Sequence, residues 1–329
     1  MTFKDFAKGV ERLVTPVSVG TIHFMQGFMN LLPISVQNKL MENTSKSVPR
    51  MGFVVEPYSF FIFYEITDSE AAQKLLPEHF VVEKTAVFDS DEPKYYCILG
   101  VFKAHSSAFW GTRLEFYVVS RDTRSNLLTW SIIDYDTNSI SHDKKYGLRS
   151  PTSSDAVLTI NHQGVLYGDI RRDDGSRQLV FEANVTAGRM KNLDQRLWLE
   201  GNLSVGYGAE LSDNSSDTFS LKFHPEEVER ALEIPRSSFT LEENTWYREI
   251  LAETPTHLVC FPYAQHFLSD SPGVTSSLKT RDELERAVNS VDFKRIPKFE
   301  TSYFKPMILG GMVLSFVITI VLITLLLLR

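Results

Sequence analysis

The pattern of hydrophobic and polar positions divides the chain into a helical beginning, a long strand-rich middle and an apolar end. Between Phe3 and Val14 the apolar residues recur at helical spacing, and a second apolar stripe follows Pro16 in the run IHFMQGFMNLLP. These positions predict an amphipathic helical segment over residues 1–50. Because it carries six basic and three acidic residues, two interpretations stay open: it lies on a membrane interface, or it packs on the rest of the protein.

From Met51 onward, alternation of apolar and polar residues replaces the helical spacing. Runs of this kind are FVVEPYSFFIFYEIT, KYYCILGVFKA, RLEFYVVSR and LLTWSIIDYDT, with polar turns such as DTRSN and DDGS between strands. The stretches PEEVERALEI and TRDELERAVNS read as amphipathic helices, the second opened by a capping box from Thr280 to Glu283. The pattern predicts an α+β fold, a curved antiparallel β-sheet or barrel of about eight to ten strands with a few peripheral helices.

The last part of the chain is apolar without interruption. From Met307 to Leu328, 22 residues include no charged or strongly polar side chain. A helix of that length spans about 33 Å, enough to cross a hydrocarbon core of about 30 Å. A strand would leave its backbone groups unpaired in lipid, so we expect one C-terminal transmembrane helix with the lipid bilayer as its partner.

The charges beside this segment predict its orientation. Basic residues outnumber acidic ones just before it, and the N-terminus lacks the apolar core and cleavage site of a signal peptide. We therefore expect a single-pass tail anchor with residues 1–305 facing the cytoplasm. The expected organisation is a helical segment over 1–50, a β-rich domain over 51–275, a helix and basic juxtamembrane linker over 276–305, and the anchor over 306–329.

Composition narrows the possible partners and cofactors. The net charge of −7 argues against binding nucleic acid, which favours a basic face. Cys97 and Cys260 lie in apolar runs and are too few for a disulfide framework or a zinc knuckle. The histidines have no metal-ligand spacing and there is no phosphate-binding glycine loop, so we expect neither a metal nor another cofactor.

Three stretches together resemble the acetoacetate decarboxylase-like superfamily: YEITDSEAAQKLLPEHF, RLEFYVVSRDTRSNLLTWSIIDYDT and YGLRSP. The similarity covers residues 53–225, and the last two stretches are closer to an uncharacterised bacterial branch than to the decarboxylases. The resemblance implies a barrel with a pocket for a small or lipid-derived carbonyl or carboxylate compound. In the decarboxylases a lysine amine forms a Schiff base with a keto acid, and an adjacent ammonium lowers the pKa of that amine.

This chain departs from the motif of that family, which resembles aromatic-Gly-aromatic-Pro-Lys-Lys. Over YGLRSP, Tyr146 and Gly147 match, Leu148 and Arg149 replace the second aromatic residue and the proline, and Ser150 stands where the nucleophilic lysine is expected. The departure argues against decarboxylation. By the same comparison, Tyr146 and Arg149 are expected ligand-binding residues at the rim of a pocket.

A lysine pair lies on the other side of the glycine. Lys144 and Lys145 are candidate catalytic residues if the loop brings one of them to the pocket, and solvated loop residues if it does not. An enzyme built on them would be a decarboxylase-like lyase.

Two more places carry candidate chemistry. Arg113 and Glu115 share one face of a predicted strand. Inside a barrel, Arg113 could bind a carboxylate while Glu115 holds it or moves a proton; on the outside they would be a surface pair worth less than about 1 kcal/mol. Asp134 and Asp136 could orient Lys145 or Arg149 or simply end a strand, and His266 is either a general base or a core residue.

These features support two main functional hypotheses. The first is a membrane-anchored enzyme acting on a small or lipid-derived carbonyl or carboxylate compound. The second is a membrane-tethered, non-catalytic module that binds an apolar or lipid ligand, with residues 1–50 covering the mouth of the barrel. An anchored scaffold for proteins is a third, without a specific patch to support it. The sequence gives neither the ligand nor the oligomeric state.

Overall fold

The computed structural model describes residues 1–14, 26, 29–47, 50–107, 109–143, 145–212, 218–270, 275–298 and 305–327. Its strands form a 13-stranded sheet, a 4-stranded sheet and a 2-stranded hairpin. The large sheet contains β1 (Arg50–Val55), β2 (Ser59–Glu65), β3 (Phe80–Val82), β4 (Lys84–Thr85), β5 (Lys94–Ser106), β6 (Trp110–Asp122), β7 (Leu128–Thr137), β13 (Arg189–Asn192), β14 (Ser204–Tyr207), β15 (Thr218–Lys222), β16 (Arg230–Glu233), β18 (His257–Phe261) and β19 (Gln265–Asp270). The second sheet contains β10 (Val157–Ile160), β11 (Val165–Arg171), β12 (Gln178–Asn184) and β17 (Phe239–Asn244), and the hairpin consists of β8 (Ser141–Asp143) and β9 (Gly147–Arg149).

Seven strands of the large sheet close into a barrel. The order β5-β1-β19-β15-β14-β7-β6 returns to its start because β6 also pairs with β5. Most pairs are antiparallel, as predicted, but β14 runs parallel to β7. Closure leaves these strands without free edges, which accounts for the long, strongly apolar β5, β6 and β7.

Alternation along β6 separates two hydrophobic cores. Tyr117 and Val119 belong to the cluster inside the barrel, whereas Leu114, Phe116 and Val118 pack toward the second sheet. The inner cluster draws on every strand of the barrel through Val55, Ile98, Tyr117, Trp130, Val205, Leu221 and Phe267. The barrel is therefore filled largely by side chains, many of them aromatic.

Among the described residues, the helices with defined bounds are few, as predicted. They are α1 (Phe3–Leu13), α3 (Ile34–Ser47), α4 (Ser69–Lys74), α5 (Gly201–Leu203), α6 (Arg281–Asn289) and α7 (Lys305–Leu327). A π-helical segment spans Arg196–Glu200, and 3₁₀ turns span Val185–Ala187, Pro225–Val228 and Arg236–Ser238. Helix α6 opens with the predicted capping box from Thr280 to Glu283.

One predicted helix is wrong. The run PEEVERALEI forms only the turn Pro225–Val228 and then the strand β16, which pairs with β13 and β18. Tertiary pairing overrides the helical spacing here. The expected number of strands was also too low, because many strands are only two to four residues long.

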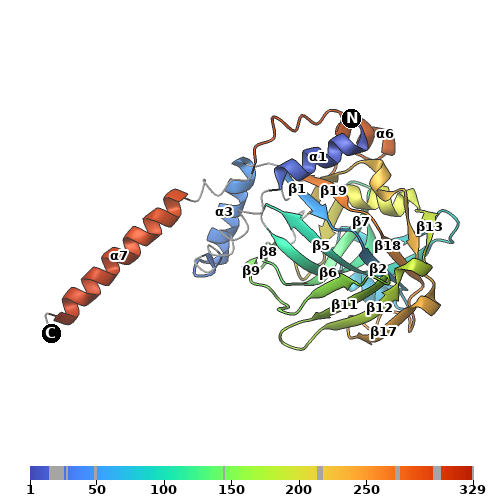
Figure 1. The fold of residues 1–329 in the computed structure, drawn as a ribbon, viewed down its shortest axis with the longest axis horizontal. Coiled ribbons are helices and arrows are strands. Elements are labelled where there is room, and N and C mark those ends of the chain that lie inside the picture. Colours follow the sequence, from blue (N-terminus) through green and yellow to red (C-terminus); the bar gives the residue numbers. More distant parts are fainter. Residues whose placement is uncertain are drawn as a thin grey trace.

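The N-terminal helix packs on the protein rather than projecting from it. Phe6, Val10 and Leu13 of α1 are buried in the inner core, and a Cβ on Gly52 of β1 would lie 2.9 Å from the carbonyl oxygen of Val10. For α1 the structure selects the packing alternative. Helix α3 also lies against the strands, on the side of the molecule from which α7 projects (Figure 1).

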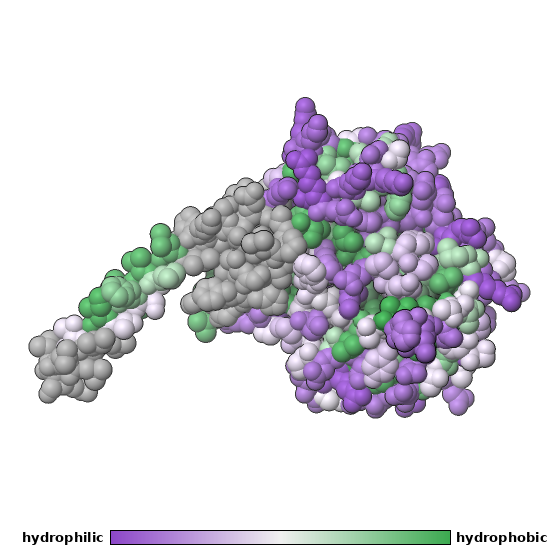
Figure 2. Space-filling view, viewed as in Figure 1, coloured by the Kyte–Doolittle hydropathy of each residue, from purple (hydrophilic) through white to green (hydrophobic). Residues whose placement is uncertain are grey.

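At the C-terminus, α7 is a 23-residue helix. Its described side chains are mostly exposed and hydrophobic, and Figure 2 shows this part of the helix green or pale, in contrast to the largely purple and white body. A search of the described residues for a helix with the length and hydropathy of a membrane span finds none. The anchor stays a prediction, and Leu328 and Arg329 lie outside the described residues.

Candidate functional site

The predicted pair on β6 faces the interior of the barrel. The side chains of Arg113 and Glu115 are 14% and 9% exposed, respectively. Arg113 Nε donates a hydrogen bond to Glu115, and the Tyr117 hydroxyl donates a second one to the same carboxylate. The Arg113 guanidinium also lies 4.0 Å from the centre of the Tyr135 ring. Of the two alternatives for this pair, the structure selects the interior one.

The positive charge of Arg113 is balanced by the negative charge of Glu115. Burial alone would lower the pKa of Arg113, but the negative charge of Glu115 outweighs it and raises that pKa. Burial, and then the charge of Glu115, raise the pKa of the Tyr117 hydroxyl well above its usual value. Arg113 is thus a permanent cation whose carboxylate partner comes from its own strand. A ligand carboxylate would have to compete with Glu115 for it.

The loop that carries Lys145 and the YGLRSP stretch forms the hairpin β8–β9, and α3 packs against it. Gly147 adopts a φ of +72°, which favours glycine. The Gln37 Oε1 accepts a hydrogen bond of 2.8 Å from the backbone N–H of Leu148, and His142 Nε2 lies 3.0 Å from Asn38 Oδ1. A Cβ on Gly147 would lie only 2.5 Å from Gln37 Oε1. The hairpin and the helix therefore form one unit.

Tyr135 connects this unit to the barrel interior. The Arg149 guanidinium lies 5.2 Å from the centre of the Tyr135 ring and 5.1 Å from that of Tyr146. The Tyr135 hydroxyl accepts hydrogen bonds from Ser141 Oγ at 2.9 Å and from Arg149 at 3.4 Å. Since Arg113 contacts the same ring, Tyr135 is shared by the buried pair and by the arginine at the rim.

A surface depression of about 680 Å³, wide open to solvent and called the cavity below, lies between α3 and the hairpin. One part of its lining is apolar and the other polar. The apolar residues are Leu32, Pro33, Ile34 and Leu148, and the polar ones are Asn30, Gln37, Tyr146, Arg149, Ser150 and Thr152. Two of the three expected ligand-binding residues, Tyr146 and Arg149, thus line the same cavity, whereas the third, Arg113, does not. The cavity lies beside the barrel and not inside it.

Lys145 is placed differently from what Schiff-base chemistry needs. Lys145 is solvent-exposed and donates a hydrogen bond of 2.7 Å to Glu210. That hydrogen bond raises the pKa of Lys145, which reduces the population of the free amine. Lys144 lies outside the described residues. Ser150, at the position of the family's lysine, accepts hydrogen bonds from Gln26 at 2.6 Å and Asn30 at 3.4 Å.

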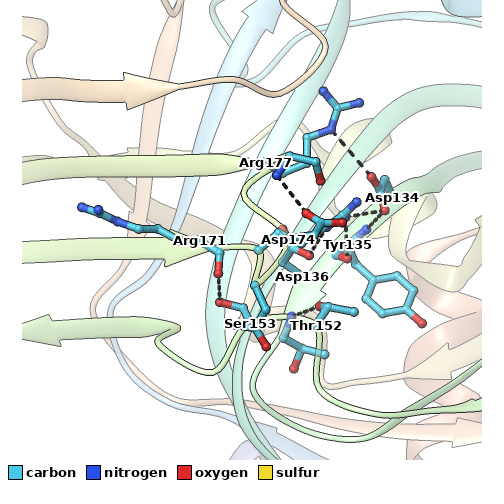
Figure 3. Close-up of polar contacts among 12 residues, drawn as sticks. Asp134, Tyr135, Asp136, Thr152, Ser153, Arg171, Asp174 and Arg177 are labelled. Atoms are coloured by element: carbon cyan, nitrogen blue, oxygen red, sulfur yellow. Dashed lines mark hydrogen bonds and ion pairs between the residues drawn. The ribbon is translucent and has the colours of Figure 1, made fainter.

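The two aspartates of β7 have other partners than those considered. Arg172 donates a hydrogen bond of 2.6 Å to Asp136 and one of 2.9 Å to Asp134. Arg177 lies 4.0 Å from Asp134 (Figure 3). Burial raises the pKa of Asp136. This cluster ties β7 to the turn between β11 and β12, so the aspartates pair with these arginines and not with Lys145 or Arg149.

His266 is a structural histidine at the contact with α1. Its Nδ1 lies 3.1 Å from Glu227 and its Nε2 3.5 Å from Glu11 of α1. Burial alone would lower the pKa of His266, but the hydrogen bond and charge of Glu227, with the charge of Glu11, raise it. The two glutamates explain how His266 is accommodated in the mostly apolar run CFPYAQHF.

The two cysteines and a possible metal site add no functional site among the described residues. Cys97 and Cys260 are fully buried, and burial raises the pKa of both thiols. Within the described ranges, no three His, Cys, Asp or Glu side chains are grouped closely enough to hold a metal ion.

Two residues that organise the site, Tyr135 and Gln37, were not predicted from the sequence. The orientation of Tyr135 could have been predicted, because it lies between the two aspartates of β7 and therefore faces the opposite side of the sheet. Gln37 gave no signal, since its role depends on the docking of α3 against a hairpin more than 100 residues away in the chain.

No family model matches the chain, and no curated protein matches it. Two solved structures are similar to it at low identity. The acetoacetate decarboxylase of Legionella pneumophila is 14% identical with a TM-score of 0.42, covering 68% of this chain and 88% of that one. An acetoacetate decarboxylase from another structural study is 12% identical with a TM-score of 0.40, covering 72% of this chain and 94% of that one.

Proposed function

We propose that this protein is a membrane-tethered binding domain for a small amphiphilic carboxylate, such as a lipid-derived acid. The observation that carries the proposal is Arg149, whose guanidinium lies against the rings of Tyr135 and Tyr146 in the lining of a cavity with an apolar side. A guanidinium can stack on aromatic rings with its planar face and form paired hydrogen bonds with a carboxylate through its N–H groups. A volume of about 680 Å³ is within the usual range for small-molecule sites.

Binding fits the residues better than catalysis does. Lys145 is exposed and pairs with Glu210, and Glu115 is engaged by Arg113 and Tyr117. Neither group is poised to attack a carbonyl or to move a proton from a ligand in the cavity. When the protein is incubated with a keto acid and then reduced with borohydride, Lys145 should stay unmodified. A covalent adduct on Lys145 would reinstate the enzyme hypothesis.

The membrane part of the proposal rests on the apolar run of residues 307–328. We propose that it anchors the chain with residues 1–305 on the cytoplasmic side. The exposed apolar surface of α7 supports this, because water is an unfavourable environment for it. The chain should stay with membranes in alkaline carbonate and leave them in detergent, and a chain ending at residue 304 should be released without detergent.

The ligand proposal is tested by comparing a medium-chain fatty acid with its primary amide, by calorimetry in detergent. Replacing Arg149→Met should weaken binding of the acid about ten- to a hundredfold, because a hydrogen bond to a charged group contributes roughly 1.5–3 kcal/mol. Binding of the amide should change little. Arg171→Met is the matched control, since Arg171 is an exposed arginine paired with Asp169 on β11. Equal binding of acid and amide by the unmodified protein would refute the proposal.

A further inference from the structure

An apolar tip lies at the start of α3, beside the cavity. We define it as residues 31–36, of which Leu31, Leu32, Ile34 and Val36 are the large hydrophobic members. All six residues are exposed, none is charged, and Leu31 is 81% exposed. Elsewhere among the described residues of the body, the large exposed hydrophobic side chains are mostly single, as at Trp110, Val157 and Met190. A contiguous exposed group of this kind indicates a surface that is covered in use.

The position of the tip points to what covers it. Leu32 and Ile34 also line the cavity and place the tip beside the candidate site, whereas Leu31 is not part of the lining. The tip belongs to the helix on the side of the body from which α7 projects (Figure 1). The seven residue steps from Lys298 to Lys305 extend at most about 25 Å, so the start of α7 stays close to the body.

The surroundings of the tip have the chemistry of a membrane interface. Lys39 and Lys145 are exposed near it, on α3 and on the hairpin that α3 contacts. The exposed Tyr146 lines the same cavity. Apolar side chains bordered by lysines and a tyrosine are typical of segments that enter the headgroup region.

We propose that residues 31–36 insert into the bilayer interface, so that the cavity opens toward the lipid and takes its ligand from the membrane. The inference rests on the proposed function and adds to it the route by which the ligand enters. It also resolves the two alternatives for the N-terminal segment by position: α1 packs on the barrel, and the start of α3 meets the membrane.

The test uses the full chain in vesicles, with a single added cysteine carrying an environment-sensitive fluorophore. Cys97 and Cys260 are buried, so the added cysteine is the accessible one among the described residues. The label at Leu31→Cys should be quenched at least twofold by brominated lipids and little by aqueous iodide. The label at Met190→Cys, on β13 at the far side of the body, should show the reverse.

A third label, Val317→Cys in α7, separates the tip from the anchor. If lipid quenches the α7 label but iodide quenches the one at position 31, the tip proposal fails while the anchor stands. Protection of position 31 from both quenchers would mean that protein covers it, a second copy or another segment of this chain, and would also overturn the proposal.

A charge in the tip separates ligand entry from ligand binding. Leu31 does not line the cavity, so Leu31→Asp should leave the affinity for the fatty acid in detergent unchanged. The same substitution should slow transfer of the acid from vesicles to the protein at least fivefold, whereas Met190→Asp should not. A loss of affinity in detergent, or transfer at the unmodified rate, would contradict the inference. Absence of any acid binding by the unmodified chain would instead refute the proposed function.

Discussion

Arg113 and Arg149 contact the same tyrosine ring, yet their environments give them different roles. Arg113 is buried with Glu115 as its partner, so its charge is balanced within the barrel. Arg149 lies at the cavity beside polar and apolar side chains. The buried pair therefore supports Tyr135 from inside, while Arg149 meets the ligand from outside. The sequence identified both arginines but not the ring between them.

The buried pair should matter for stability. Glu115→Gln leaves Arg113 as a buried, uncompensated cation, so the free energy of unfolding should fall by about 3–5 kcal/mol. Urea denaturation measures this. Glu65→Gln is the control, since the Glu65–Lys94 pair is about 40% exposed on both sides and should contribute less than about 1 kcal/mol. Equal effects of the two substitutions would show that the interior pair is solvated.

At the scale of elements, the site depends on the docking of α3 against the hairpin β8–β9. Both elements are short or polar, and each lacks a strong hydrophobic face of its own. Their contact includes Gln37 against Gly147 and Leu148, and Asn38 against His142. The sequence showed Gly147 as part of the family's aromatic-Gly motif. In the structure a glycine is required there because φ is positive and Gln37 approaches closely.

Two glycines allow this contact to be measured. Gly147 and Gly175 have φ values of +72° and +74°, but only the first has a neighbour at the position of an added Cβ. Gly175→Ala should destabilise by about 1–2 kcal/mol through the backbone alone. Gly147→Ala should lose about 1 kcal/mol more, because it displaces the hydrogen bond of Gln37. The excess should vanish in a Gln37→Ala background; if it persists, the helix does not dock as described.

At the scale of the whole molecule, the period of two along the strands was enough to predict an α+β fold with a curved antiparallel sheet or barrel. The pattern does not encode the parallel pairing of β14 with β7 or the closure of β5 on β6, because pairing partners depend on contacts between distant segments. The run PEEVERALEI shows the same limit, since Ala231 and Leu232 become part of a strand only next to β13 and β18. The cavity was unpredictable for the same reason: its two walls come from α3 and the hairpin.

The attachment of α1 to the barrel makes stability depend on pH. Glu227 and Glu11 raise the folded-state pKa of His266, so its contribution is fully present below the unfolded pKa and lost as pH rises through the folded one. Burial also raises the pKa of Glu227, which acts in the same direction. His266→Gln should therefore lower the free energy of unfolding by about 2 kcal/mol at pH 6 and by less at pH 9.

The control for this pH dependence is His162→Gln, because His162 is exposed on a turn and should change stability by less than about 0.5 kcal/mol at either pH. A larger effect of His266→Gln at pH 9 than at pH 6 would contradict the assignment of a protonated histidine between the two glutamates.

The most direct test of the binding site is photocrosslinking of the full chain with a fatty acid that carries a diazirine near the end of its chain, followed by peptide mapping. Adducts are expected on α3 and on the hairpin, at Ile34, Tyr146 or Leu148. Unmodified acid should compete for them, and Arg149→Met should lose them. Adducts confined to α7, or an unchanged yield in Arg149→Met, would contradict the proposed binding site.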